Sequence, residues 1–78
     1  MPQRCNVQFL LDTLHKKAGV PLNIPNIESA SWEVLGIESL GLTEVCTSLE
    51  HAFGHPIPHE EALTTKNVQE LLDFVNAL

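Results

Sequence analysis

Apolar side chains recur with helical spacing in separate segments of the chain. In residues 7–18 they follow the i, i+3, i+4, i+7 and i+11 spacing of one helical face, with Asn6 able to cap the start and Gly19 able to end it. The segment Ser39–Phe53 repeats this spacing and is followed by Gly54. The apolar faces consist of Val7, Leu10, Leu11, Leu14 and Ala18, and of Leu42, Val45, Cys46, Leu49 and Phe53.

A third apolar stripe follows Asn67 and Glu70, which have the spacing of a capping box. Pro58 can open a single helical turn through residues 60–63, because proline is tolerated at the first helical position. Residues 20–38 show no period, and their prolines exclude a continuing helix, so we expect a long ordered loop. The third stripe is Val68, Leu71, Leu72, Val75 and Leu78, and the loop's apolar anchors are Leu22, Ile24, Ile27 and Trp32.

These elements predict an all-α fold, a four-helix bundle with three longer helices, one short helix and a long first loop. The 78 residues have room for one modest core, so residues 1–78 are expected to form a single domain and a monomer. No apolar run is long enough to span a membrane, and two isolated cysteines without a signal peptide indicate free thiols in a reducing compartment, here the cytoplasm.

The net charge of -6 is unevenly distributed along the sequence. Arg4, Lys16 and Lys17 lie near the start, whereas from Glu28 onward nine acidic residues are opposed only by Lys66. Nucleic-acid binding needs clustered Lys and Arg, so this distribution argues against it. It favours a docking partner that presents a basic patch.

Ser39 stands where the long loop is expected to meet the second long helix. From the residues alone, a serine at a helix start is most often an N-cap, and this structural role is the favoured interpretation. A hydrolase nucleophile is disfavoured, because a nucleophile elbow needs Gly two positions before the serine, where Ile37 stands. The histidines His15, His51, His55 and His59 lack the spacing of a zinc site. We therefore expect neither a catalytic residue nor a metal ligand.

The sequence around Ser39 belongs to a longer pattern. Trp32 precedes Leu35-Gly36-Ile37-Glu38-Ser39-Leu40, and Leu49-Glu50-His51-Ala52-Phe53 closes the following helix. Further matching segments are Ile57-Pro58-His59-Glu60-Glu61-Ala62 and Val68-Gln69-Glu70-Leu71-Leu72-Asp73-Phe74-Val75. In this register, which is sustained for over forty residues, the chain resembles the acyl carrier protein family over nearly its whole length from the first helix onward. The bundle is accordingly expected to be of the acyl-carrier type.

This resemblance implies that a phosphopantetheinyl transferase attaches 4′-phosphopantetheine to Ser39, and that the arm's thiol carries an acyl or aminoacyl group. A phosphodiester is an anion, which the N-terminus of a helix favours. The resemblance also implies that partner enzymes for acyl loading, condensation or tailoring dock on the outer face of the second long helix. The residues expected there are Glu38, Leu40, Thr43, Glu44, Thr47 and Glu50.

The chain departs from the family pattern at Glu38, where Asp usually precedes the serine, and a longer carboxylate caps a helix less well. Gly41 in the first helical turn costs stability and is expected to loosen the site. The outer face is less acidic than in carriers of fatty-acid synthesis, which favours a carrier of polyketide or hybrid secondary metabolism. The alternatives are a fatty-acid-synthesis carrier and a carrier-shaped interaction module whose serine is never modified.

Overall fold

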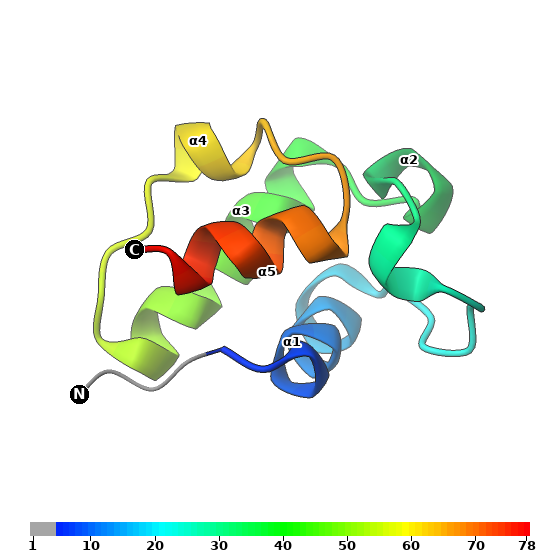
Figure 1. The fold of residues 1–78 in the computed structure, drawn as a ribbon, viewed down its shortest axis with the longest axis horizontal. Helices are drawn as coiled ribbons and strands as arrows, with labels where there is room; N and C mark the ends of the chain where they lie inside the picture. The colour runs from blue at the N-terminus through cyan, green and yellow to red at the C-terminus, as the bar shows by residue number, and fades with distance from the viewer. Residues whose placement is uncertain (1–4) are drawn as a thin grey trace.

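The computed structural model describes residues 5–78, so the first four residues of the predicted 1–78 domain, Arg4 among them, lie outside the described residues. The described chain is helical, which confirms the all-α prediction (Figure 1). Its elements, in order, are α1 (Val7–Ala18), the 3-10 turn η1 (Ile27–Ser29), α2 (Trp32–Leu35), α3 (Ser39–Phe53), α4 (His59–Ala62) and α5 (Val68–Asn76).

Helices α1 and α3 begin and end, and α5 begins, at the predicted residues because their caps are encoded locally. The side chain of Asn6 accepts a hydrogen bond from the Phe9 N–H at 2.7 Å, and Gly19 ends α1 in the left-handed conformation with φ 72°. The Asn67 side chain accepts from the Glu70 N–H at 2.9 Å. The capping box is modified, however, since the Glu70 carboxylate accepts from the Lys66 N–H rather than from Asn67.

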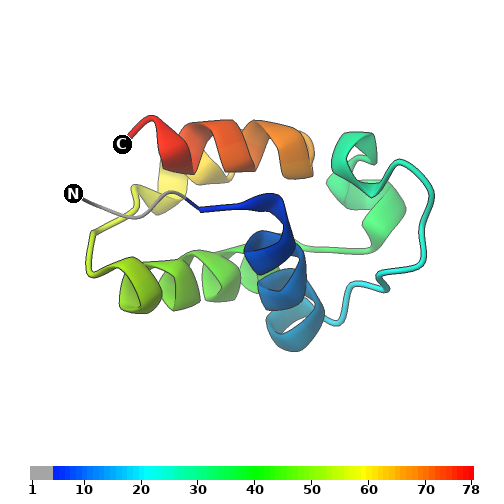
Figure 2. The same cartoon turned by 60° about the horizontal axis from the view of Figure 1, so that its bottom comes forward.

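The core forms where α1 crosses α3, and α5 contacts α1 on the opposite side of the core from α3 (Figure 2). The predicted inner face of α3 is confirmed, with Phe53 only partly buried at its end. Each large apolar side chain that is fully buried contributes about 1.5–3 kcal/mol. The fully buried side chains of these helices are Leu10, Leu14, Val45, Cys46, Leu49, Val68 and Leu71.

The first loop has more secondary structure than the sequence predicted. It contains η1 and the single turn α2, which the Ser31 hydroxyl caps by accepting from the Val34 N–H at 3.2 Å. Elements of three or four residues are too short to show a period, so the pattern could not reveal them. Ile27 and Trp32 are buried anchors as predicted, but the expectation for Leu22 was wrong, because its side chain is 42% exposed.

The remaining differences lie towards the C-terminus. Pro58 is the N-cap of α4 rather than its first residue, and Leu63 is its C-cap. Leu78 lies beyond the end of α5 and is 47% exposed, so it does not belong to the apolar stripe. No helix in residues 5–78 is long and apolar enough to cross a membrane.

Candidate functional site

The start of α3 is defined by the turn that precedes it. Gly36 ends α2 with φ 73°, and its N–H donates to the Glu33 carbonyl at 3.1 Å. The Ile37 N–H donates to the Trp32 carbonyl at 3.0 Å, and the Ile37 side chain is buried. A left-handed residue followed by a buried anchor redirects the chain into a new helix.

Ser39 is the first residue of α3, and Glu38 is the N-cap in extended conformation. The interpretation of Ser39 as the capping residue was therefore wrong. The side chain of Glu38 makes no capping hydrogen bond, in line with the expectation that Glu caps less well than Asp. Ser39 is exposed, so its hydroxyl lies at the surface of a helix start whose N-cap side chain is not engaged.

The first turn of α3 has the chemistry of an anion site. The first hydrogen bond of the helix runs from the Leu42 N–H to the Glu38 carbonyl at 3.0 Å, so the amides of residues 39–41 have no partner within the helix. The 15 residues of α3 align their peptide dipoles, which places partial positive charge at this end. These residues fit a phosphate group attached to Ser39.

Gly41 lies in this turn of α3 and faces Ala18 at the end of α1. A Cβ atom added at Gly41 would stand 3.4 Å from Ile37 Cγ1 and 3.5 Å from Ala18 Cβ, both ordinary van der Waals separations. The backbone approach therefore does not require glycine. Gly41 is still expected to lower the stability of the helix, and no steric constraint explains why glycine stands there.

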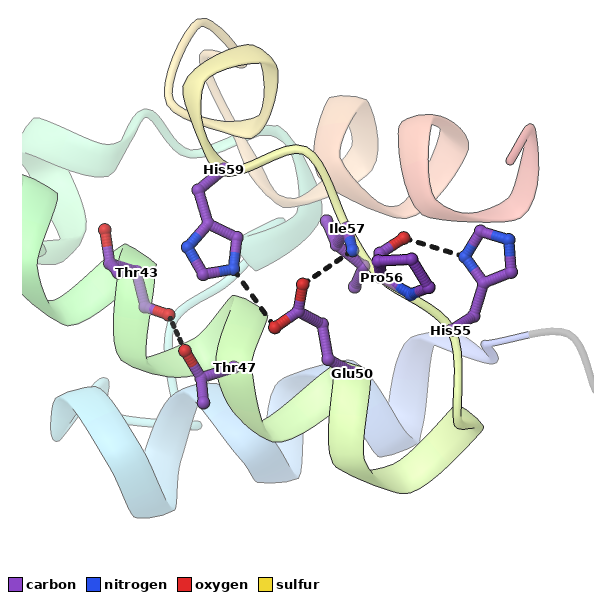
Figure 3. A network of polar contacts seen from close by, with 7 residues as sticks. All are labelled: Thr43, Thr47, Glu50, His55, Pro56, Ile57 and His59. Atoms are coloured by element: carbon purple, nitrogen blue, oxygen red, sulfur yellow. Dashed lines mark hydrogen bonds and ion pairs between the residues drawn. The ribbon is translucent and has the colours of Figure 1, made fainter.

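The outer face of α3 continues from Ser39 as the sequence predicted. Leu40 is 74% exposed, and Glu44 and Thr47 are also exposed, whereas Thr43 is partly buried. The Thr47 hydroxyl donates to the Thr43 carbonyl at 3.0 Å (Figure 3), so it is already paired within the helix. These positions form an accessible surface beside Ser39, and their role in docking stays a prediction.

Glu50 differs from the other predicted docking residues because its carboxylate is engaged within the chain. One oxygen, Oε2, accepts from the Ile57 N–H at 2.7 Å, and the other, Oε1, lies 3.3 Å from His59 Nε2 (Figure 3). The second contact is an ion pair by distance and falls short of hydrogen-bond geometry. The Ile57 hydrogen bond, with a smaller effect from His59, holds the pKa of Glu50 below its ordinary value of 4.5 against the opposing effect of burial. Glu50 thus joins α3 to the segment before α4.

The cysteines are free and buried. Burial, reinforced by the nearby charge of Glu50, raises the pKa of Cys46 to about 11, and burial raises the pKa of Cys5. Both thiols are therefore protonated at neutral pH and are poor nucleophiles. Within residues 5–78, no three His, Cys, Asp or Glu side chains gather in a way that could hold a metal ion.

Sequence comparison relates most of the chain to known proteins. Residues 8–75 match the family model described as a phosphopantetheine attachment site. The acyl carrier protein of Syntrophobacter fumaroxidans is 30% identical over 66 residues, covering 85% of this chain and 82% of that protein. That of Thermosynechococcus vestitus is 45% identical over 49 residues, covering 63% of this chain and only 60% of that protein.

Structural comparison agrees with the sequence matches. The actinorhodin holo acyl carrier protein of Streptomyces coelicolor superposes with a TM-score of 0.83 at 28% identity, covering 99% of this chain and 93% of that one. The same protein carrying a 5-phenyl-3-oxo-pentyl group gives a TM-score of 0.86. The cofactor of such a chain is covalently attached 4′-phosphopantetheine. The chain belongs to the acyl carrier proteins of the phosphopantetheine-binding family.

Proposed function

We propose that Ser39 is the attachment residue, and that the modified chain carries an acyl group as a thioester between enzymes of a biosynthetic system. The observation that carries this proposal is an exposed Ser39 at the first position of α3, next to first-turn amides that have no partner within the helix. The family match over residues 8–75 supports it.

Attachment needs a nucleophile, and the Ser39 hydroxyl supplies it. Its oxygen forms a new ester bond to the phosphorus of coenzyme A that bears the pantetheine group, as the bond from that phosphorus to adenosine 3′,5′-bisphosphate breaks. The hydroxyl proton passes to a base of the phosphopantetheinyl transferase, the first partner of this chain. The product keeps a negative charge beside the amides of residues 39–41, which favour it.

The chain itself supplies display rather than catalysis. When bound, the arm provides a terminal thiol for thioester chemistry. The protonated, buried thiols of Cys5 and Cys46 do not compete with it for acyl groups. Acyl-loading, condensing and tailoring enzymes would meet the exposed surface formed by Leu40 and Glu44 beside Ser39.

The pathway we propose is polyketide or hybrid secondary metabolism. Two features support it, the likeness to carriers of the actinorhodin polyketide synthase and an outer face of α3 on which Glu50 is engaged in internal contacts. The curated relatives are named only as acyl carrier proteins, so fatty-acid synthesis is the alternative. Presenting the modified chain to ketosynthases of both pathways, with the same acyl group loaded, distinguishes them by which enzyme accepts the group.

Intact-protein mass spectrometry tests the attachment. The chain is incubated with coenzyme A and a permissive transferase, alongside Ser39→Ala and the control Ser48→Ala, which changes a partly buried serine of the same helix. We expect one arm's mass on the parent and on Ser48→Ala and none on Ser39→Ala. A correctly folded parent that gains no mass would refute the proposal and favour the unmodified interaction module. Ester hydrolysis that is lost in Ser39→Ala would favour a hydrolase instead.

A further inference from the structure

Trp32 connects two parts of the chain that are distant in sequence. Its backbone N–H donates to the Lys66 carbonyl at 3.1 Å, and its indole N–H donates to the Thr65 carbonyl at 2.9 Å. Residues 65–67 precede α5, and an isolated antiparallel bridge between Ser31 and Asn67 extends the same contact. The side chain is only 9% exposed and belongs to the core.

The same residue also holds the turn that leads into α3. The Trp32 carbonyl accepts the Ile37 N–H at 3.0 Å, and Ile37 stands two positions before Ser39. Hydrogen bonds therefore run without interruption from the α4–α5 connection, through Trp32, to the turn before the attachment residue. Polar groups that are withdrawn from water, as the indole N–H partly is, are costly to leave unpaired, which favours this arrangement.

The alternative is that Trp32 only fills the core, as an apolar aromatic ring would. The indole N–H allows the two roles to be tested separately, because a phenyl ring would fill the same part of the core without the hydrogen bond to Thr65. Here the indole nitrogen lies at 2.9 Å from the Thr65 carbonyl oxygen, an ordinary hydrogen-bond length, and at 3.3 Å from the Thr65 hydroxyl. The ring is thus held in position by polar contacts as well as by packing.

We propose that Trp32 is a positioning residue for Ser39, which fixes the turn at residues 36–38 to the α4–α5 connection and so presents the hydroxyl to the transferase. This inference rests on the proposed function of Ser39. It names an indole hydrogen bond, outside the motif around the serine, as a determinant of how readily the chain is modified. The residue acts through Ile37 and does not itself touch the reacting atoms.

Trp32→Phe tests this by keeping an aromatic ring and removing the indole N–H. The control is Leu10→Val, which weakens the core in α1 and removes none of the hydrogen bonds of Trp32. If the turn of the variant adopts the geometry that the transferase needs only part of the time, the apparent KM for the carrier rises in inverse proportion to that fraction. The kcat at saturation and the KM for coenzyme A stay unchanged. We expect a rise of about fivefold or more for Trp32→Phe and none for Leu10→Val while both remain folded.

The outcomes separate this inference from the proposed function. If the parent chain is not modified, the proposed function is wrong. If the parent is modified and Trp32→Phe has the parent's KM, the positioning role alone is overturned. An equal rise in Leu10→Val would likewise overturn it, because loss of stability would then be the cause.

Hydrogen exchange on a second variant, Thr65→Val, tests the same connection even if Trp32→Phe does not fold. Thr65→Val keeps the Thr65 carbonyl and removes the hydroxyl that lies near the indole and donates to the Ala62 carbonyl at 2.6 Å. We expect faster exchange of both the Trp32 indole N–H and the Ile37 amide in this variant, with α1 amides unchanged. Faster exchange of the indole N–H without any change at Ile37 would refute the connection.

Discussion

Gly41→Ala probes the first turn of α3 directly. Glycine within a helix costs about 0.5–1 kcal/mol relative to alanine, because it loses more backbone freedom on folding. Gly41 does not have a positive φ, so alanine adopts its conformation without strain. The added Cβ would meet Ile37 Cγ1 at 3.4 Å and Ala18 Cβ at 3.5 Å, which are ordinary contacts. No steric clash therefore offsets the gain in stability that alanine brings to the helix.

The expected result is a rise of about 0.5–1 kcal/mol in the free energy of unfolding. For a domain of this size each kcal/mol moves Tm by about 4–8 °C, so Tm should increase by about 2–8 °C. Thermal and urea unfolding followed by circular dichroism measure both quantities. The modification of Ser39 should persist, because the new methyl group faces Ala18 and Ile37 rather than the surface.

Gly19→Ala is the matched control for this substitution. Gly19 has open space around its missing Cβ but a φ of 72°, which costs an L-residue about 1–2 kcal/mol. It should therefore destabilise the chain although nothing clashes with it. If Gly41→Ala lowered Tm as Gly19→Ala does, our reasoning on packing would be refuted, and α3 would need glycine for close contact with α1.

Two further predictions concern the titratable groups. Because the folded pKa of Glu50 lies below 4.5, its contribution to stability is present above that pH and is lost as the pH falls through the folded pKa. Urea unfolding from pH 7 to pH 3 should show the parent more stable than Glu50→Gln at neutral pH, with the gap narrowing on acidification; a constant gap would contradict this. In the folded chain at pH 7.5, a disulfide reagent should leave Cys5 and Cys46 unreacted before modification and detect only the arm's thiol afterwards, with both cysteines reacting in urea. Rapid reaction of the folded, unmodified chain would show that burial does not protect these thiols.

The sequence predicted those parts of the fold that short-range interactions determine. The ends of α1 and α3 follow from Asn6, Gly19 and Gly54, each within a few residues of the atoms it pairs with or the helix it ends. The contact between Cys5 and Asn76 could not be predicted. Its two hydrogen bonds, at 2.8 and 2.9 Å, join backbone and side chain across 71 positions. Such pairs depend on the completed fold and leave no local pattern.

The candidate site was predicted from the long match to the family pattern and not from the serine alone. Taken alone, Ser39 indicated a cap, and only the match extending to residue 75 indicated an attachment site. Glu50 could not be assigned in this way, because its partners Ile57 and His59 lie in a segment without helical period. The family resemblance predicted that Glu50 takes part in docking, whereas its partly buried carboxylate joins α3 to the next segment.

The departure at Glu38 is best understood together with the rest of the helix start. A capping side chain would satisfy one of the free amides, and Glu38 leaves this bond unmade. Trp32 and Ile37 hold the preceding turn firmly, so the helix does not begin elsewhere to compensate. The unmodified chain therefore keeps a fixed helix start with unmet positive potential beside an exposed hydroxyl. An anion attached to that hydroxyl would accept hydrogen bonds from the free amides and would also balance the positive potential of the helix start. This is the physical reason why this serine suits a phosphodiester.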